Sequence, residues 1–382
     1  MQAGLVLALS LSWPVWPRFP ILVSANNVPA TVDHQLVDRG LSAQSGVSYP
    51  RLVADIGGTN ARFGWLAAPG SPVAQVHKLP VPDFAGPAEA ARSYLQGLQA
   101  TLGAGYQAPR QAAFAVATAV AGDRVAFTNS HWDFSCAQVQ AALGLQGLQM
   151  LNDFEALALS LPCLGDAQLR RLGPAPAGAI PTPDGTVLAV VGPGTGLGVG
   201  AVVRTRGGWV ALPGEGGHAT LAPADDLESA VLAQVRRQHA HVSAERLLSG
   251  IGLPVLHQAL GAVQGSQAPV LSAAQIVDLG TASGAAQDTL CSQTLDLFCA
   301  LLGGFAGNVA LTLGARGGLF IGGGIAPRFA DRFLASAFRP RFEAKGRFQP
   351  YLAAIPTALI TDTLAALSGA ALAIEQQVAP GG

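Results

Sequence analysis

The stretch from Leu52 to Trp65 combines residue types that bind phosphate groups. It reads LVADIGGTNARFGW, an apolar run that ends in Asp55, two glycines, then Thr59 and Asn60, and a second apolar run. This order predicts a strand, a tight turn and a returning strand. Glycine permits a positive φ and lets a ligand reach the main chain, and turn amides that face one way bind phosphate oxygens. Asp55 is the residue type that holds Mg²⁺, usually through water, so we expect a nucleotide here.

A second stretch repeats this pattern. Residues 188–203 read LAVVGPGTGLGVGAVV, and Thr195 occupies the position of Thr59. Glycine is common in the chain, 47 of 382 residues, so isolated glycine pairs carry little information. The repeat of strand, glycine turn with threonine, and strand is more specific. It suggests a duplicated α/β fold whose halves face each other across a cleft.

The pair Asn152–Asp153 ends a short apolar run and precedes an Ala- and Leu-rich segment. One interpretation is a helix N-cap, a position where Asp is common. The other is a general base, because a carboxylate is ionised at pH 7 and can accept a proton from an attacking hydroxyl. In isolation the cap is the commoner role, but beside two phosphate hairpins we favour the base.

A glycine loop, LPGEGGH at 212–218, places Glu215 and His218 three residues apart. Metal sites with this spacing are built on rigid helices with further ligands, so we favour a sugar, whose neighbouring hydroxyls need several acceptors. Glu245 follows in the segment SAER and, taken alone, is typical of a solvated helix residue.

These side chains require an alternating α/β frame from Arg51 onward. Helices are expected at 87–102, 135–143, 227–238, 244–248, 290–313, 328–337 and 363–375. Besides the two hairpins, strands are expected at 111–121, 125–129, 148–151 and 318–321. Residues 174–183, rich in Pro, Ala and Gly, are expected to form a surface linker.

Composition excludes several classes of protein. The net charge is −1 without a basic tract, which argues against nucleic acid and anionic membranes as partners. The two lysines, Lys78 and Lys345, are followed by Leu and Gly, so no GxxxxGK[ST] phosphate loop exists, and neither lies in a VAIK-like strand. The four cysteines form no CxxC or Cys/His cluster, as in a cytosolic protein with reduced core cysteines.

Residues 1–50 differ from the rest of the chain. The apolar run 3–16 has no Lys or Arg before it and is interrupted by proline, so it matches neither a signal peptide nor a membrane helix of ~20 residues. We expect a disordered extension or a mis-assigned start, with Val47 as a candidate GUG start codon.

Taken together, these motifs resemble the bacterial glucokinases of the hexokinase, actin and heat-shock ATPase superfamily, in the branch that lacks a zinc-binding CxCGxxGC motif. The resemblance covers residues 53–375. The segments that carry it stand in family order: ADIGGTNAR, AFTNSHWDFS, LNDFEALA, GPGTGLGVG, LPGEGGHATLAP, HVSAERLLSG, LGGFAGNVALTLGARGGLFIGGGIAPRF and FEAKGRF.

The resemblance implies ATP-dependent phosphorylation of D-glucose at the 6-hydroxyl, which gives glucose 6-phosphate and ADP for glycolysis. Asp153 would be the catalytic base, and Arg62 could offset phosphoryl charge. The sugar would be held by Asn152, Asp153, Glu215, His218, Glu245, Thr128 and Asn129. ATP would be bound by Ala54, Asp55, Ile56, Gly57, Gly58, Thr59 and Asn60, by Gly194, Thr195 and Gly196, and by Gly322, Gly323 and Gly324 near the adenosine. Asp55 would also place Mg²⁺, through water.

The same resemblance implies an α/β protein with a two-domain actin-like ATPase (ribonuclease H-like) fold and an active-site cleft between the domains. Residues 51–163 plus about 355–382 would form the small domain and 164–354 the large one, after the extension 1–50. A cytoplasmic homodimer is the family expectation, with glucose as the small-molecule partner and neither nucleic acid nor membrane.

Two other classes stay open at this point. Relatives of sugar kinases act as sugar-responsive repressors, but these carry a helix-turn-helix ahead of the kinase fold, and residues 1–50 show no helical periodicity. An actin-like or heat-shock-like ATPase without a sugar substrate would not need Asn152–Asp153 or the GEGGH loop.

Overall fold

The computed structural model describes residues 48–127, 130–173 and 182–376, and contacts join these described residues into one compact unit. Its first sheet has five strands in the order β3-β2-β1-β4-β7. Strand β1 pairs antiparallel with β2 and parallel with β4, and β4 pairs parallel with β7. The strands are β1 (Arg51–Ile56), β2 (Asn60–Leu66), β3 (Ala74–Pro80), β4 (Gln111–Val116) and β7 (Gly147–Asn152).

The second sheet has six strands in the order β11-β10-β9-β12-β13-β8. They are β8 (Leu169–Leu172), β9 (Val187–Pro193), β10 (Leu197–Thr205), β11 (Gly208–Leu212), β12 (Gly318–Ile321) and β13 (Thr357–Ile360). Strands β9 and β10 form an antiparallel hairpin, and β12 runs parallel to both β9 and β13. A short pair, β5 (Arg124–Ala126) and β6 (Asp133–Ser135), stands apart from both sheets.

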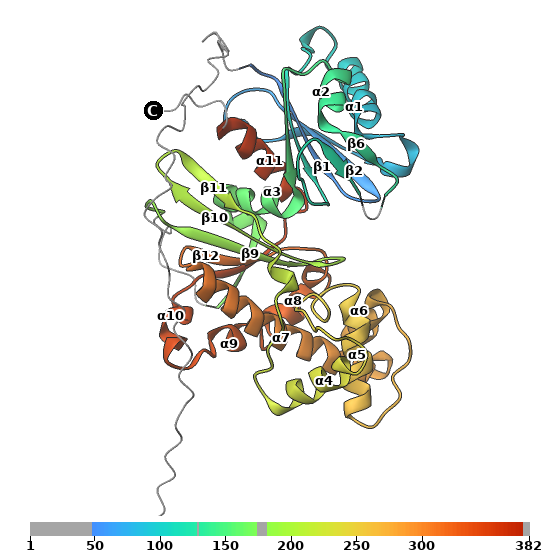
Figure 1. Ribbon diagram of the computed structural model, residues 1–382, viewed down its shortest axis with the longest axis vertical. Coiled ribbons are helices and arrows are strands. Elements are labelled where there is room, and N and C mark those ends of the chain that lie inside the picture. Colours follow the sequence, from blue (N-terminus) through green and yellow to red (C-terminus); the bar gives the residue numbers. More distant parts are fainter. Residues whose placement is uncertain (1–47, 128–129, 174–181, 377–382) are drawn as a thin grey trace, which may run out of the picture. The chain divides into compact units, whose positions relative to one another are not determined.

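Two helices, α3 (Asp153–Ser160) and α11 (Ala365–Gln376), form a layer between the sheets (Figure 1). One core cluster joins this layer to both sheets, with Val53 from β1, Val190 from β9, Leu159 from α3 and Ile374 from α11. Because apolar side chains alternate along a buried strand, the other faces of the strands need their own covering helices.

Those outer faces are covered by separate cores. On the first sheet, Leu52 and Phe114 pack with Tyr94 of α1 (Pro87–Leu102) and Val139 of α2 (Cys136–Ala142). On the second sheet, β9 and β12 pack against a larger helical cluster. Its helices are α4 (Asp226–Arg236), α5 (Gly252–Val263), α6 (Ala273–Thr281), α7 (Thr289–Leu313), α8 (Ala330–Leu334), α9 (Phe338–Glu343) and α10 (Gln349–Ala353).

Helix α7 is the centre of this larger cluster. Among the residues that the structure describes, it is the one helix long and apolar enough, by length and composition, to cross a membrane. However, 72% of its most apolar 18-residue window is buried inside the protein. Its apolar side chains therefore serve the core.

Most of the expected elements are present, and the differences have local causes. The helix expected at 244–248 is wrong: these residues form turns, because the N–H groups of Ala244 and Glu245 donate to the carbonyls of Ala219 and Gly217, in and just after the glycine loop. The helix expected at 328–337 is a 3-10 turn, Ala326–Phe329, followed by the short α8. Most of the expected linker, residues 174–181, lies outside the described residues, as do 1–47.

One boundary of the domain prediction needs correction. The small domain was expected to resume at about residue 355, but β13 at 357–360 pairs with β12 and β8 in the second sheet. Backbone hydrogen bonds across a ladder fix a strand to its sheet, so the small domain can resume only after β13, with α11. The division into two domains otherwise stays a prediction.

Candidate active site

Both glycine motifs form strand–turn–strand hairpins. In the first, Ile56 pairs with Ala61 across β1 and β2, and the Gly57 N–H donates to the Asn60 carbonyl at 2.9 Å. In the second, Pro193 pairs with Leu197, and the Gly194 N–H donates to the Gly196 carbonyl at 2.9 Å. The secondary structure expected around both motifs is confirmed.

A positive φ, one of the two reasons expected for the glycines, is not found at three of these positions. Neither Gly57 nor Gly194 nor Gly196 has a φ in the left-handed region. At Gly196 the requirement is space, because a Cβ there would overlap the carboxylate of Glu245. Gly323, in the third glycine motif, does have a positive φ of 75°, and its main chain packs against Pro193. Gly196 and Gly323 thus allow close approach within the protein itself, whereas a Cβ at Gly194 would meet nothing within 4 Å.

Asp55 lies at the end of β1, directly opposite Arg62 on β2. Its Oδ2 is 3.1 Å from Nη1 of Arg62. Burial raises the pKa of Asp55, and the Arg62 charge and hydrogen bond oppose that rise. The pairing places a cation beside the first hairpin, where phosphate groups are expected.

Asn152 and Asp153 stand at the junction of β7 and α3. Asn152 is the N-cap of α3, and its Oδ1 accepts from the Phe154 N–H at 2.9 Å. Its Nδ2 donates to the Thr118 carbonyl at 3.1 Å, which fixes the amide after β4. The cap interpretation therefore applies to Asn152, which leaves Asp153 as the first residue of the helix.

Asp153 has an unusual carboxyl group. Its pKa is raised to about 6, mainly by burial; a hydrogen bond from the Phe154 N–H at 2.9 Å acts to lower it, and the nearby charge of Asp55 acts to raise it. Such a group is still mostly ionised at pH 7 and is a stronger base than an ordinary aspartate. This is the behaviour expected of a general base near neutral pH.

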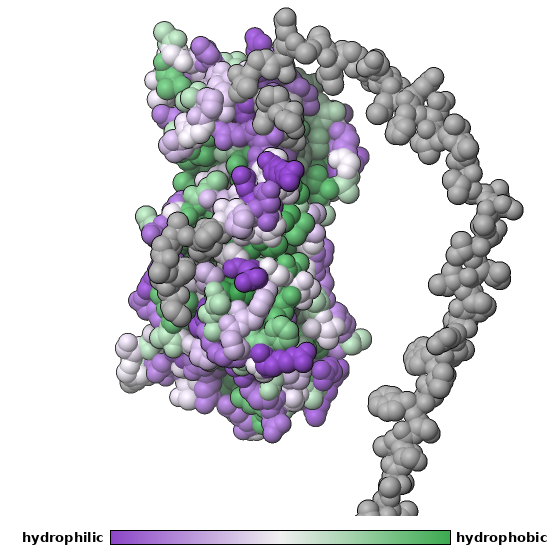
Figure 2. Space-filling model, turned by 90° about the vertical axis from the view of Figure 1, so that its left-hand side faces the viewer, coloured by the Kyte–Doolittle hydropathy of each residue, from purple (hydrophilic) through white to green (hydrophobic). Residues whose placement is uncertain are grey.

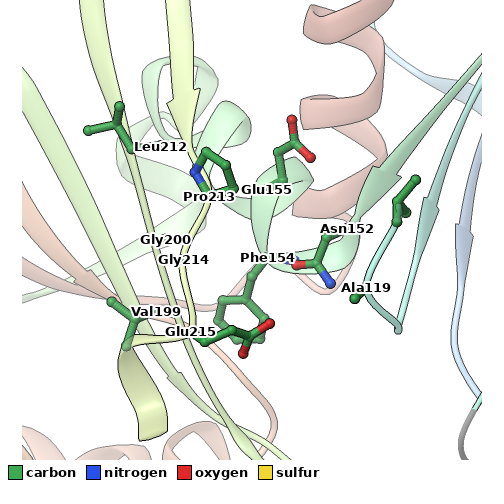
Figure 3. Close-up of a pocket in the computed structure, with 11 residues that line it drawn as sticks. Ala119, Asn152, Phe154, Glu155, Val199, Gly200, Leu212, Pro213, Gly214 and Glu215 are labelled. Atoms are coloured by element: carbon green, nitrogen blue, oxygen red, sulfur yellow. The ribbon is translucent and has the colours of Figure 1, made fainter. Parts of the chain in front are cut away.

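A pocket of about 160 Å³ opens between the start of α3 and strands β10 and β11. Figure 3 shows Asn152 and Glu215 there together with the Phe154 ring. Its wall is formed by Ala119, Val120, Asn152, Phe154, Glu155, Val199, Gly200, Leu212, Pro213, Gly214 and Glu215. The structure thus brings two of the predicted sugar ligands to one cavity, with Asp153 as the chain neighbour of the first.

Glu245 and His218 lie beside the second hairpin. Their closest approach is 4.0 Å, between Oε1 of Glu245 and Nδ1 of His218. The other carboxylate oxygen, Oε2, accepts from the Leu197 N–H at 2.9 Å, and the Gly250 N–H donates to the Gly194 carbonyl at 2.8 Å. The same acidic side chain therefore touches the candidate phosphate turn and faces the glycine loop.

The remaining expected site residues either lie outside the pocket or are not described by the structure. Thr128 and Asn129 lie outside the described residues. Gly322 lies at the end of β12, where its N–H donates to the Val191 carbonyl at 2.9 Å, so this glycine motif adjoins the second hairpin. Of the residues that line the pocket, only Asn152 and Glu215 were predicted as site residues. Phe154 and Glu155 were missed, although their position directly after Asn152–Asp153 is a usable signal.

The carboxylates fit a magnesium ion that arrives with a nucleotide. In residues 48–127, 130–173 and 182–376 there is no cluster of three or more His, Cys, Asp or Glu side chains. Mg²⁺ is normally held by one or two carboxylates, water and substrate phosphates. Asp55 supplies such a partial site. Its charge also acts on the carboxylate of Asp153.

The two sheets, the shared helical layer and the paired glycine hairpins define the class of actin-like sugar kinases. A ROK-family glucokinase from Streptomyces griseus, solved with glucose and AMPPNP, shares this fold with a TM-score of 0.53 at 16% identity, covering 85% of this chain and 98% of that one. A glucokinase structure from an Antarctic psychrotroph matches with a TM-score of 0.76 at 38% identity, over 85% and 98% of the two chains.

Sequence comparison narrows the class. The glucokinase of Neisseria meningitidis serogroup C is 46% identical over 330 residues, which are 86% of this chain and 96% of the relative. The family model for glucokinase matches residues 52–377. The chain belongs to the glucokinase family, and the resemblance drawn from its motifs is confirmed.

Proposed function

We propose that this protein transfers the γ-phosphoryl group of ATP to the 6-hydroxyl of D-glucose, giving glucose 6-phosphate and ADP. The observation that carries the proposal is the half-buried Asp153 at the helix start, beside the hairpin that holds Asp55, with its pKa raised to about 6. Membership of the glucokinase family supports the choice of substrate.

Asp153 is proposed to orient the 6-hydroxyl and to accept its proton as the oxygen attacks phosphorus. Asn152 and Glu215, which share a pocket, and Glu245 with His218 are proposed to bind the other hydroxyls. Thr128 and Asn129 keep the sugar-binding role that the family resemblance implies.

The hairpin amides around Gly57–Asn60 and Gly194–Gly196 are proposed to hold the ATP phosphates, with Gly322–Gly324 near the adenosine. Asp55 would hold Mg²⁺ through water, and the ion, when bound, would offset negative charge on the phosphate oxygens. Arg62 pairs with Asp55 at 3.1 Å, so the positive charge of Arg62 also lies beside the proposed phosphate site. We propose a cytoplasmic homodimer in which the two domains close over the substrates and exclude water.

The direct test measures ATP consumption by the purified chain with Mg²⁺ and glucose, mannose, fructose or N-acetylglucosamine, against a sugar-free blank. Glucose-dependent ADP with an equal amount of glucose 6-phosphate is the expected result. Equal ADP release with and without sugar would instead indicate a bare ATPase. Glucose binding in calorimetry without turnover would indicate a sugar sensor.

Asp153→Asn tests the base. The amide keeps the shape and can still accept from the Phe154 N–H, but it cannot take up a proton. Turnover should fall on the order of 10²–10⁴-fold, with glucose still bound in calorimetry. Asp166→Asn is the matched control, since Asp166 pairs with Arg171 at the surface and its loss should leave turnover unchanged. Near-normal turnover in Asp153→Asn would exclude Asp153 as the base.

A further inference from the structure

One aromatic ring, that of Phe154, packs from the start of α3 against the strands of the second glycine hairpin. Phe154 follows Asp153 in α3, and its N–H donates to Oδ1 of Asn152 and Oδ1 of Asp153, each at 2.9 Å. Its ring also lines the pocket with Val199 and Glu215 (Figure 3). The main chain of this residue is thus tied to both candidate sugar ligands at the helix start.

The ring occupies a notch made by two glycines of the second hairpin. Gly192 on β9 and Gly198 on β10 are directly paired across the ladder, so both open onto the same face of the sheet. A Cβ at Gly192 would lie 2.5 Å from Cζ of Phe154, and a Cβ at Gly198 would overlap the ring. Any larger residue at either position would displace the ring.

The notch adjoins the phosphate turn. Gly192 lies two residues before Gly194, and Gly198 lies two residues after Gly196. A second close approach supports the contact, because a Cβ at Gly200 would lie 3.0 Å from the Phe154 carbonyl oxygen. Closely packed interiors transmit displacement instead of absorbing it, so the ring sets the separation of α3 from this hairpin.

We propose that Phe154 is a positioning residue that fixes the distance between the carboxylate of Asp153 and the turn Gly194–Gly196. The kinetic consequence rests on the proposed phosphoryl transfer, whereas the packing role does not. Because phosphoryl transfer depends mainly on alignment and electrostatics, a displacement of about 1 Å costs on the order of 10²-fold in rate.

Misalignment also has a chemical signature. If the sugar oxygen is out of line, water can attack in its place: the bond from the γ-phosphorus to the bridging oxygen breaks, and a new bond forms to the water oxygen. The products are ADP, inorganic phosphate and a proton, and glucose is left unchanged. The ratio of ADP to glucose 6-phosphate then rises above one, a change that simple loss of folded protein does not produce.

The first test compares Phe154→Leu with Phe333→Leu. Leucine lacks the ring atoms that reach Gly192. Phe333 is fully buried in the helical cluster on the far side of the second sheet, so its truncation is a stability control. In Phe154→Leu we expect kcat to fall about 10–100-fold, KM for glucose and ATP to change less than about threefold, and the product ratio to exceed one. The control should keep a ratio of one.

A loss of activity that only follows the folded fraction, with the product ratio still at one, would overturn the proposal. So would a raised KM with unchanged kcat. Gly198→Ala provides a second test, because its Cβ must push the ring away and should reduce kcat similarly. Adding Phe154→Leu to Gly198→Ala should restore part of that loss, and no restoration would contradict the notch.

Hydrogen–deuterium exchange gives a readout that does not depend on turnover. In the ligand-free protein, the amides of residues 194–198 should exchange faster in Phe154→Leu than in the wild type, and at the wild-type rate in Phe333→Leu. Equal rates in all three proteins would overturn the positioning role. A wild type that makes no glucose 6-phosphate, with the expected exchange pattern, would refute the proposed function alone.

Discussion

At the scale of single residues, the sequence leaves open whether Asp153 caps a helix or acts as a base. In the structure, the cap is Asn152. Asn152 caps α3 and is held by Thr118, so Asp153 does not have to cap the helix with its carboxylate. The cap fixes the position of the next residue, Asp153, whose carboxylate is partly removed from water. This burial is the main reason that its pKa is raised to about 6. The residue that caps the helix and the proposed base are therefore neighbours in the chain.

The raised pKa predicts the acid limb of the activity profile. The ionised form of Asp153 is the proposed base, so kcat/KM, which reports on the free enzyme, should be level near pH 7 and fall below about pH 6. The fall should approach tenfold per pH unit, measured by initial rates at subsaturating glucose. A level profile down to pH 5 would contradict the assignment.

The same shift predicts a stability cost at neutral pH. The pKa of Asp153 is above its unfolded value of 3.8, so the folded state binds more protons between the two values and loses stability as the pH rises through them. Asp153→Asn should therefore stabilise the ligand-free protein by on the order of 1–3 kcal/mol above pH 6. The gain should vanish below about pH 4, as measured by urea unfolding at several pH values.

The local structure around the candidate site was predictable where one short motif contains all the residues that form it. Asp55, Gly57 and Thr59 stand in such a motif, and its hairpin is confirmed. The packing of Phe154 was not predictable, because the two glycines that receive its ring follow it by 38 and 44 residues in the sequence. Contacts of this kind arise from tertiary packing, which spacing in the sequence does not express.

At the scale of elements, predictability depended on length and burial. Helix α7 has 25 residues, and a long periodic segment gives a clear signal. Strand β3 is mostly exposed at the sheet edge, and β8 and β13 have four residues each. Short or exposed strands carry little hydrophobic pattern, so their place was determined by pairing with neighbours.

Neighbouring glycines in α7 provide a prediction at this scale. A Cβ at Gly303 would overlap the main chain of Phe338 in α9, whereas a Cβ at Gly304 would meet nothing within 4 Å. Gly303→Ala should separate α7 from α9 and cost about 1–3 kcal/mol. Gly304→Ala should gain about 0.5–1 kcal/mol from helix propensity. Thermal unfolding of both variants measures the contrast, and equal shifts would contradict the packing.

At the scale of the whole molecule, the described fold is anchored from Tyr49 onward. The Tyr49 hydroxyl donates to Glu375 at 3.0 Å, and Arg51 donates to the Ile374 carbonyl at 2.9 Å, so the start of β1 is bound to α11. The glucokinase family model also begins only at residue 52.

A chain that begins at Ser48 should therefore keep the wild-type kcat and melting temperature. A chain that begins at Leu52 loses both anchors and should lose about 2–4 kcal/mol, since one of them is a buried charged hydrogen bond. Activity assays and thermal unfolding of the two truncations test this. A large loss in the Ser48 variant would show that residues 1–47 take part in folding or catalysis.

The sandwiched position of α11 has a consequence for biosynthesis. This helix, at residues 365–376, packs between the sheets and against α3, whose first residue is the candidate base. A nascent chain that has not reached α11 has only α3 in this layer, so the inner faces of both sheets stay partly uncovered. The layer that packs against the helix carrying Asp153 is therefore complete only after nearly the entire chain has been synthesised.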